Sequence, residues 1–395
     1  MSTLAALLSR PGGGLAIALV VLIAGWWLLR TGKSRGGRVY RYAGYAVCGL
    51  SALLVIGSIV SIVRVHQVET RYPPIGKRVD VGGYRIHVLA EGEAHGRSTV
   101  VWIPGGHGAG LHFHGHHKAL RAETRSIIFD RPGTGWSDPG SFPRSTALEA
   151  EELSRLLDKA GEQGPFLLVG HSYGGLLAVN YARRNLKKVS GLVLLDPTQP
   201  DMMLYLPAKR GNVLGGLVLM GRIGGLLTSF GIKYDPLAVF AKSSPQVAQI
   251  LERERALIGD ENWAILSAQS INPAAHWTSA SIYQEFGASR ISEAAPDLVV
   301  YDGELGDIPV YLVTPPASEQ ERQQYAEYLT RAAGRDAVER SLRFMDRARL
   351  RYLATSTQSR HILAPAKTSH NFPYEQPDFV LSVVRQALKK EESEP

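Results

Sequence analysis

The sequence has little cysteine: Cys48 is the single one among 395 residues. One cysteine cannot form an intramolecular disulfide, so the fold depends on a packed core, and export of the protein is neither supported nor excluded. The sequence also shows no internal repeat. Apolar residues make up 45% of the chain and charged residues 20%. This composition is sufficient for one large or two modest globular domains.

Acidic residues are missing from one strongly basic segment. The formal net charge is +8, and part of the excess lies between residues 30 and 41, which contain no acid and five cations: Arg30, Lys33, Arg35, Arg38 and Arg41. This block separates two apolar runs. Nucleic acid is therefore a poor explanation for the positive charge, and we expect no nucleic-acid partner.

The two apolar runs are typical of membrane helices. Residues 43–63 carry no charge and would form a helix of about 31 Å, close to the ~30 Å of a bilayer core. Residues 12–29 are shorter and contain Trp26 and Trp27 near their end, which suit a membrane interface. Cations follow this run where a signal peptide would have small residues. We therefore expect two transmembrane helices, with a signal anchor or a buried hairpin as the alternatives.

The basic block also indicates an orientation. Cations beside membrane helices stay on the cytoplasmic side under the positive-inside rule. Both ends of the chain would then lie outside the cytoplasm. Four cations after the second run argue in the opposite direction: Arg64, Arg71, Lys77 and Arg78.

The segment Gly170-His-Ser-Tyr-Gly174 indicates a catalytic serine. It follows the apolar run Phe166–Val169 directly and precedes a stretch of helical character. A serine is held out at the top of a sheet by a very tight strand-to-helix turn, and glycines at 170 and 174 leave room for that turn. Ser172 is the candidate nucleophile, and the alternative is a structural turn with an idle serine.

Four further blocks occur in a familiar order. They are Thr99–Gly110, Ser126–Asp138, Gly191–Pro197 and Lys367–Asn371. Together with the serine turn, they resemble the α/β-hydrolase fold family over residues 76 to 390. One departure is Pro104-Gly105, where the family usually has His-Gly. The alternation of apolar runs and helical stretches independently predicts a mostly parallel sheet covered on both faces.

The resemblance implies a domain organisation. Residues 1–65 would be a membrane anchor and residues 66–75 a linker with Pro73-Pro74. Residues 76–395 would form an α/β-hydrolase domain with an eight-stranded sheet and a helical cap inserted at about 198–295. Within it, residues 211–230 are apolar and glycine-rich. This stretch is interpreted either as a buried cap helix or as a surface that faces substrate tails or the bilayer.

A serine nucleophile needs a base, and the base needs an orienting acid. His370 lies in the block that resembles the family's histidine loop. The family usually places the acid after the seventh strand, but no aspartate follows residues 308–314 here, and Glu319 comes late. Asp196 ends the sixth strand, an alternative position in some members. We expect Asp196 to be the acid, with Glu319 or Asp201 as alternatives.

Developing negative charge on the substrate oxygen needs preformed N–H donors. Tyr173, directly after the nucleophile, supplies one. The loop after the third strand supplies the other, at Gly106, with His107 as the alternative in register.

Five histidines crowd one short segment: His107, His112, His114, His116 and His117. Histidine pairs can bind zinc, but the segment has no carboxylate or thiolate. We expect pocket-lining and cap contacts instead, with no metal and no cofactor.

These features predict a membrane-anchored serine hydrolase that cleaves an ester, or less favourably an amide, through an acyl-enzyme. The substrate would be a small-molecule ester or a lipid-like molecule. One alternative is a peptidase of the aminopeptidase type. Another is a catalytically silent, hydrolase-like binding protein, which the missing acid after the seventh strand keeps open.

Overall fold

The computed structural model describes residues 2–34, 37–106, 108–199, 211–235, 241–242, 245–288, 296–316 and 347–393. Its centre is an eight-stranded sheet with the order β1-β2-β4-β3-β5-β6-β7-β8. The strands are β1 (Lys77–Asp80), β2 (Arg85–Glu91), β3 (Thr99–Ile103), β4 (Ser126–Phe129), β5 (Phe166–His171), β6 (Val189–Leu195), β7 (Val310–Thr314) and β8 (Ser359–Leu363). Only β1/β2 and β2/β4 pair antiparallel. The predicted mostly parallel, eight-stranded α/β-hydrolase fold is confirmed.

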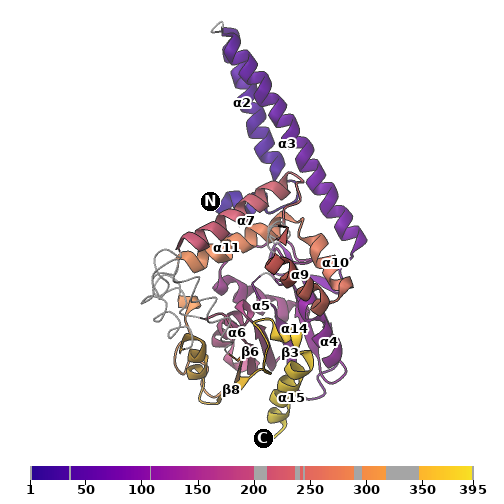
Figure 1. The fold of residues 1–395 in the computed structure, drawn as a ribbon, viewed down its shortest axis with the longest axis vertical. Coiled ribbons are helices and arrows are strands. Elements are labelled where there is room, and N and C mark those ends of the chain that lie inside the picture. The colour runs from indigo at the N-terminus through magenta and orange to yellow at the C-terminus, as the bar shows by residue number, and fades with distance from the viewer. Residues whose placement is uncertain are drawn as a thin grey trace.

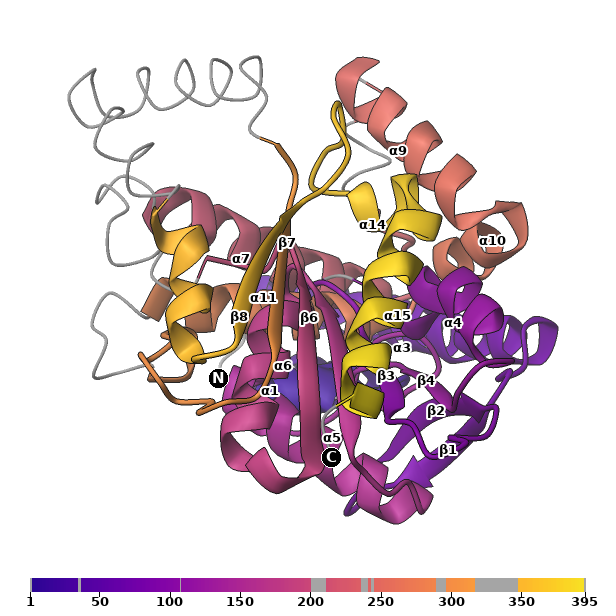
Figure 2. The same ribbon diagram turned by 90° about the horizontal axis from the view of Figure 1, so that it is seen from below.

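The central strands β3, β4, β5 and β7 are buried on both faces, and successive side chains of each strand point to opposite sides. Val101 of β3 and Leu168 of β5 belong to one core cluster, with residues of α5 (Thr146–Ala160) and α6 (Tyr173–Arg184). Their neighbours Trp102 and Val169 belong to the cluster on the other face, with residues of α15 (Pro377–Ser393) and of α4 (His114–Leu120). The helices surround the strands in Figure 2. This double covering explains why the central strands read as unbroken apolar runs.

The N-terminal part is helical: α1 (Ser2–Leu8), α2 (Gly14–Ser34) and α3 (Arg38–Arg71). Helices α2 and α3 project together from the globular part (Figure 1) and are long and apolar enough to cross a membrane. They contain most of the two expected spans. Residues 66–71 of the expected linker 66–75 continue α3 as a helix. No glycine or proline interrupts that stretch, whereas Pro73 prevents the helix from continuing.

Small side chains bring α2 and α3 close together. A Cβ built at Gly25 would lie 2.7 Å from Cys48 Sγ, and one at Gly44 would lie 2.7 Å from the Leu29 side chain. Ser51 Oγ donates a hydrogen bond to the carbonyl oxygen of Ala18 at 2.8 Å. Small residues and hydroxyl groups at a helix pair are typical of packing in lipid.

Helices replace the strand–helix alternation between β6 and β7. The described ones are α7 (Gly211–Ser229), α9 (Pro245–Ile258), α10 (Asp260–Gln269) and α11 (Pro273–Ala288). We call these four the inserted helices. In Figure 1, α7 and α11 lie at the end of the globular part that is nearest to α2 and α3.

Candidate active site

Ser172 lies in a tight turn between β5 and α6. Its φ and ψ are 54° and −123°, a backbone conformation that is rare and strained for a residue with a side chain. A Cβ built at Gly170 would lie 2.3 Å from the Gly174 carbonyl oxygen, and one at Gly174 would lie 2.2 Å from the Ile103 carbonyl oxygen. Only glycine fits at either position. The glycine spacing of the sequence is therefore explained by backbone contacts on both sides of Ser172.

Asp196 and His370 meet at the same edge of the sheet. Asp196 directly follows β6, which pairs in parallel with β5, so it lies beside the Ser172 turn. Its Oδ2 lies 2.7 Å from Nδ1 of His370, which follows β8. The Asp196 side chain is 5% exposed and that of His370 is 52% exposed. The carboxylate is thus buried, while the imidazole ring reaches solvent.

The other carboxylate oxygen of Asp196 faces a cation. Oδ1 lies 3.3 Å from Nε of Arg349, which forms an ion pair with it. The two oxygens of Asp196 therefore face an imidazole and a guanidinium. Arg349 had no signal in the sequence, because it belongs to none of the recognisable blocks. The alternative acids Glu319 and Asp201 lie outside the described residues.

His171 supports the loop that carries His370. Its Nε2 donates a hydrogen bond to the His370 carbonyl oxygen at 2.9 Å, and Tyr374 Oη donates to its Nδ1 at 3.3 Å. Burial, and then the neighbouring His370, lower the pKa of His171 to about 3. The ring is therefore neutral and serves as a fixed donor and acceptor rather than as a charge. The sequence identified His171 only as a neighbour of the serine.

The structure does not join every candidate residue. Among the described residues, no hydrogen bond links Ser172 Oγ to His370, although both lie at one edge of the sheet. Catalytic hydrogen bonds of free enzymes are often long and tighten when substrate binds. Of the two contacts expected between Ser172, His370 and Asp196, the Asp196–His370 pair is formed in this structure.

The loop after β3 lies against the Ser172 turn. A Cβ built at Gly105 would lie 3.4 Å from Ser172 Cβ, and one at Gly106 would lie 3.8 Å from Tyr173 Cβ. Arg131 Nη2 donates hydrogen bonds to the carbonyl oxygens of Gly105 and Gly106, at 2.6 and 2.7 Å. In a trans peptide the N–H points opposite to the C=O. The N–H of Gly106 shares a peptide with the Gly105 carbonyl, so it points away from Arg131.

Arg131 belongs to a buried network of ion pairs. Arg131 Nη1 lies 3.3 Å from Oε2 of Glu149, and Arg144 Nη2 lies 3.4 Å from Oε1 of the same carboxylate. Arg144 also donates to Glu152. All four side chains are buried, so each charge depends on its partners for stability. The sequence showed Arg131 only as part of a turn motif, and its contacts became visible in three dimensions.

One inserted helix contacts the neighbour of the candidate nucleophile. Glu285 of α11 accepts hydrogen bonds from the backbone N–H and the hydroxyl of Thr146, each at 3.0 Å. The hydroxyl of Tyr173 donates to Thr146 Oγ1 at 3.4 Å. Burial raises the pKa of Glu285 to about 7. The contact between α11 and the site therefore includes a carboxyl group that titrates near neutral pH.

The described histidines of the crowded segment make separate contacts. His116 Nε2 donates to the Pro373 carbonyl oxygen at 2.9 Å, and burial lowers the pKa of His116 to about 4. His117 pairs with Glu91, and His114 contacts Asn262 of α10. The part of the chain that the structure describes holds no group of three or more potential ligands placed for a metal. His107 is outside it.

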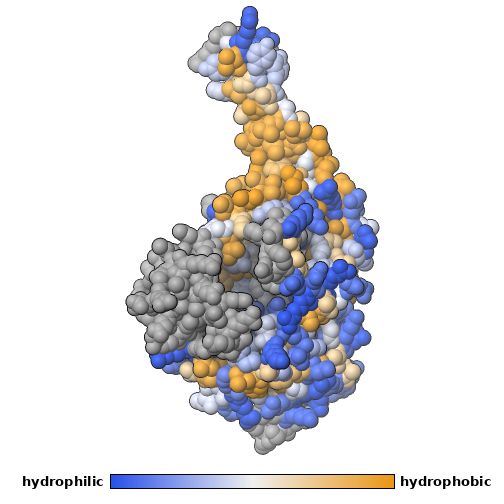
Figure 3. All heavy atoms as spheres, viewed as in Figure 1, coloured by the Kyte–Doolittle hydropathy of each residue, from blue (hydrophilic) through white to orange (hydrophobic). Residues whose placement is uncertain are grey.

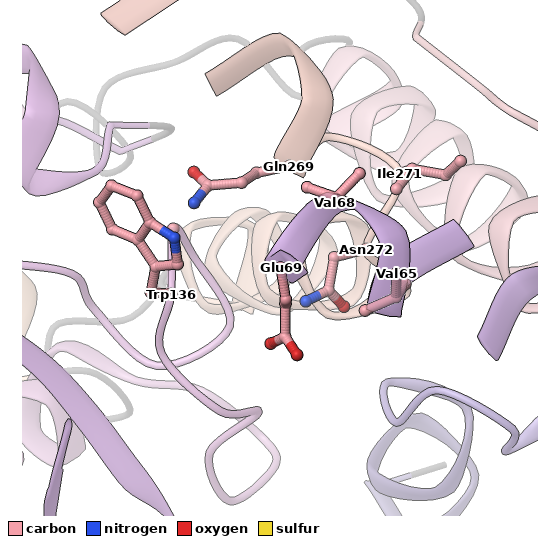
Figure 4. Close-up of a pocket in the computed structure, with 8 residues that line it drawn as sticks. Val65, Val68, Glu69, Trp136, Gln269, Ile271 and Asn272 are labelled. Carbon is pink, nitrogen blue, oxygen red and sulfur yellow. The ribbon is translucent and has the colours of Figure 1, made fainter. Parts of the chain in front are cut away.

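A pocket lies at the junction between α3, the turn after β4 and the inserted helices (Figure 4). None of the candidate catalytic residues lines it. In the part of the chain that the structure describes, neither polar atom of the buried Gln269 amide has a hydrogen-bond partner. Its lining consists of Val65, Val68, Glu69, Gly135, Trp136, Gln269, Ile271 and Asn272.

Residues 100–383 match the sequence profile of the alpha/beta hydrolase family. The chain is 29% identical over 168 residues to the uncharacterized protein YbdG of Bacillus subtilis, which covers 42% of this chain and 50% of YbdG. The fold is similar to that of a thermophilic esterase from Thermogutta terrifontis, with a TM-score of 0.50, 17% identity, and coverage of 80% of this chain and 98% of the esterase. It is also similar to the epoxide hydrolase CorEH, with a TM-score of 0.52, 15% identity, and coverage of 80% and 98%.

The sequence profile and the structural similarities support different conclusions. The profile spans most of the globular part, whereas identities below 25% with solved structures show the fold alone. The matched region covers 14% and 50% of the lengths of the first two curated relatives. The activity must therefore be argued from the site itself.

Proposed function

The chain belongs to the alpha/beta hydrolase family, and from that premise we propose that it is a membrane-anchored serine hydrolase that cleaves carboxylic esters. Family membership and the fold supply the scaffold of a hydrolase. The serine mechanism and the ester substrate are inferred from the residues at the carboxyl edge of the sheet. No cofactor is needed for this chemistry, because the nucleophile, the base and the oxyanion donors all belong to the chain.

In the first half of the proposed reaction, Ser172 Oγ attacks the ester carbonyl carbon. His370 Nε2 accepts the hydroxyl proton, while Asp196 holds Nδ1–H at the other side of the ring and stabilises the imidazolium. The N–H groups of Tyr173 and Gly106 hold the negative oxygen of the tetrahedral intermediate. The intermediate collapses, His370 gives its proton to the leaving alkoxide, and the acyl group stays on Ser172.

In the second half, water replaces the alcohol. His370 takes a proton from the water molecule, which attacks the acyl carbon. Collapse of this second intermediate breaks the bond to Ser172 Oγ, and the proton returns from His370 to the serine. A carboxylic acid is released and the enzyme is restored. The exposure of the His370 ring gives water access to the base.

A single observation carries this proposal. The 2.7 Å contact between Asp196 Oδ2 and His370 Nδ1 occurs beside a serine held at a φ of 54°. A carboxylate that accepts Nδ1–H selects the tautomer in which Nε2 is free to accept a proton. A structural carboxylate–histidine pair has no need of a strained serine turn beside it.

Membrane anchoring is the second part of the proposal. Helices α2 and α3 have the length and apolar composition of membrane spans, and most of their large apolar side chains are exposed. The cations between them favour a cytoplasmic tip. The hydrolase domain, with the inserted helices as its cap, then lies on the extracytoplasmic side of the membrane.

The test of the catalytic proposal is covalent labelling of the full chain in detergent by a fluorophosphonate probe. Labelling at Ser172, lost in the Ser172→Ala variant, is the expected result. An intact, folded protein without labelling would instead favour a hydrolase-like binding protein. Parallel kinetics on nitrophenyl esters and on aminoacyl anilides separate an esterase from a peptidase of the aminopeptidase type, because only the second hydrolyses the anilides efficiently.

A further inference from the structure

The inserted helix α7 exposes an apolar side. Leu219, Ile223 and Leu226 are 58%, 43% and 41% exposed, and their spacing places them on one side of the helix. Thr228 and Ser229 are buried. A surface helix normally buries its apolar side and exposes its polar side, so the arrangement of α7 is inverted.

Glycines account for this inversion. A Cβ built at Gly221 would lie 2.9 Å from Ala280 Cβ of α11, and one at Gly225 would lie 2.4 Å from Nε1 of Trp277. Helix α11 therefore contacts α7 along its glycines and leaves the leucine and isoleucine side chains outside. Arg222 is the only charged residue in α7, and it donates to Gln284 of α11 at 2.9 Å.

The end of α7 is attached to the proposed membrane hairpin. Ser61 Oγ of α3 donates to the Thr228 carbonyl oxygen at 2.7 Å, and Arg64 Nη1 donates to the Gly231 carbonyl oxygen at 2.6 Å. Ser61 lies inside the uncharged run 43–63, and Arg64 is the first charge after it. Helix α7 therefore ends at the level where the apolar run of α3 ends.

Helix α1 extends the same surface. Ser229 Oγ of α7 donates to the Leu8 carbonyl oxygen at 2.9 Å, while Leu4 and Leu7 of α1 are exposed. In Figure 3, the apolar surface of α2 and α3 continues onto the end of the globular part where α7 lies. We define the α1/α7 face by its exposed apolar side chains: Leu4, Leu7, Leu219, Ile223, Leu226 and Ile232.

We propose that the α1/α7 face inserts into the lipid bilayer, as an in-plane surface around the base of the α2/α3 hairpin. The proposal rests on the membrane anchoring proposed above. Exposed, contiguous apolar surface marks an interaction site, and a helix with one apolar side can lie about 5–10 Å deep at the acyl boundary. Lipid is the favoured occupant because the face is continuous with the surface of the candidate spans.

The insertion bears on the class of substrate. Helix α7 packs on α11, and Glu285 of α11 contacts Thr146, which accepts a hydrogen bond from Tyr173. One layer of helix therefore separates the inserted face from the neighbour of Ser172. An ester with a long acyl chain would partition into the same boundary region and reach the site without crossing water. This assigns the proposed hydrolase a lipid-like ester rather than a freely soluble one.

The test uses lipid quenching of a fluorophore on the full chain. Cys48→Ala gives a cysteine-free background, because Cys48 is the only cysteine. Ile223→Cys then carries an environment-sensitive nitrobenzoxadiazole label in phosphatidylcholine–phosphatidylglycerol vesicles that contain lipids with brominated acyl chains. Leu53→Cys in α3 reports the membrane span. Leu186→Cys, 45% exposed at the amino ends of the strands, is the matched control.

Clear acyl-chain quenching at position 223, as well as at position 53, and its absence at position 186 are the expected result. Quenching at 53 without quenching at 223 overturns the inserted face while the anchoring stands. Protection of position 223 from both the lipid quencher and aqueous iodide also overturns it, because a second copy of the chain then covers α7. Absence of quenching at 53 refutes the anchoring itself, whereas the fluorophosphonate result tests the catalytic proposal independently.

Discussion

Nη2 of Arg131 lies 2.7 Å from the carbonyl oxygen of Gly106, in the loop after β3. The same nitrogen also holds the Gly105 carbonyl oxygen. A single buried guanidinium thus fixes the orientation of two successive peptides. The proposed oxyanion donor, the N–H of Gly106, belongs to the same peptide as the Gly105 carbonyl. The contact between Arg131 and that carbonyl therefore preorganises the donor, because an N–H whose peptide is already oriented costs no rearrangement during the reaction.

Arg131→Lys should lower kcat by about 10²-fold with a smaller change in KM, since an ammonium cannot reproduce the forked contacts of a guanidinium. Steady-state kinetics on a nitrophenyl ester measure both constants. Arg144→Lys is the control. Arg144 is equally buried and shares Glu149, but none of its hydrogen bonds among the described residues reaches the loop after β3. Equal losses of kcat in both variants would mean that Arg131 only stabilises the fold.

Ser172→Ala should reduce turnover by about 10⁴–10⁶-fold, because the other groups cannot act without a nucleophile. The variant should keep its thermal unfolding temperature, since it loses only a hydroxyl group in a turn. Activity and circular dichroism are measured on the same preparation. Retention of more than a few per cent of activity would refute the assignment of the nucleophile.

Asp196→Asn should reduce kcat by about 10³–10⁴-fold, because an amide can present an N–H where His370 Nδ1–H needs an acceptor. Glu319→Gln should change kcat little. Asn also replaces Asp well in backbone capping, so a nearly silent Asp196→Asn variant would reassign Asp196 to a structural role. A large loss in Glu319→Gln alone would make Glu319 the acid.

Glu285→Gln should flatten the pH dependence of stability. Burial raises the pKa of Glu285 from the ordinary 4.5 to about 7, so the folded protein holds a proton that the unfolded chain releases. The unfolding free energy of the wild type then falls as pH rises from about 4.5 to about 7, by roughly 3 kcal/mol at most. Thermal unfolding in detergent at several pH values measures this fall. The exposed Glu93→Gln serves as the control, and parallel curves for wild type and Glu285→Gln would contradict the prediction.

The cations between α2 and α3 should determine the orientation in the membrane. An alkaline phosphatase fused after Pro395 is expected to be active, as it folds outside the cytoplasm. Replacing the five cations of residues 30–41 with Gln should give mixed orientations and lower phosphatase activity. An inactive phosphatase fusion together with an active cytoplasmic reporter at the same point would reverse the predicted topology.

The fold could be predicted from the sequence because its signals are local. Apolar runs of strand length alternate with helical stretches, and this pattern alone favours a parallel sheet covered on both faces. The turn at Ser172 was predictable for the same reason, since Gly170 and Gly174 are required by backbone contacts of the turn itself. The helical extension of α3 to Arg71, beyond the uncharged run 43–63, had no hydropathy signal, because hydropathy reports where a membrane run ends and not where a helix ends.

The candidate site was predictable only in part. Chain order and the lack of an aspartate after β7 favoured Asp196. Its contact with His370 is present, and its role as the acid stays a prediction. The roles of Arg131, His171 and Arg349 could not be predicted, because each depends on which side chains meet across distant segments. The contact of Glu285 could not be predicted either, since its partner Thr146 is 139 positions away in the chain.

The sequence by itself determined the order of the candidate residues along the chain: a serine in a tight turn, an aspartate at the end of a strand and a histidine in a late loop. Tertiary structure decided how these are supported and what surrounds them. The glycines of α7 illustrate the difference. The apolar, glycine-rich composition of α7 is compatible with a buried helix. Close packing of α11 along the glycines, however, leaves Leu219 and Ile223 exposed. Which side of an apolar helix faces outward depends on the shape of its neighbour, and that shape exists only once the chain has folded.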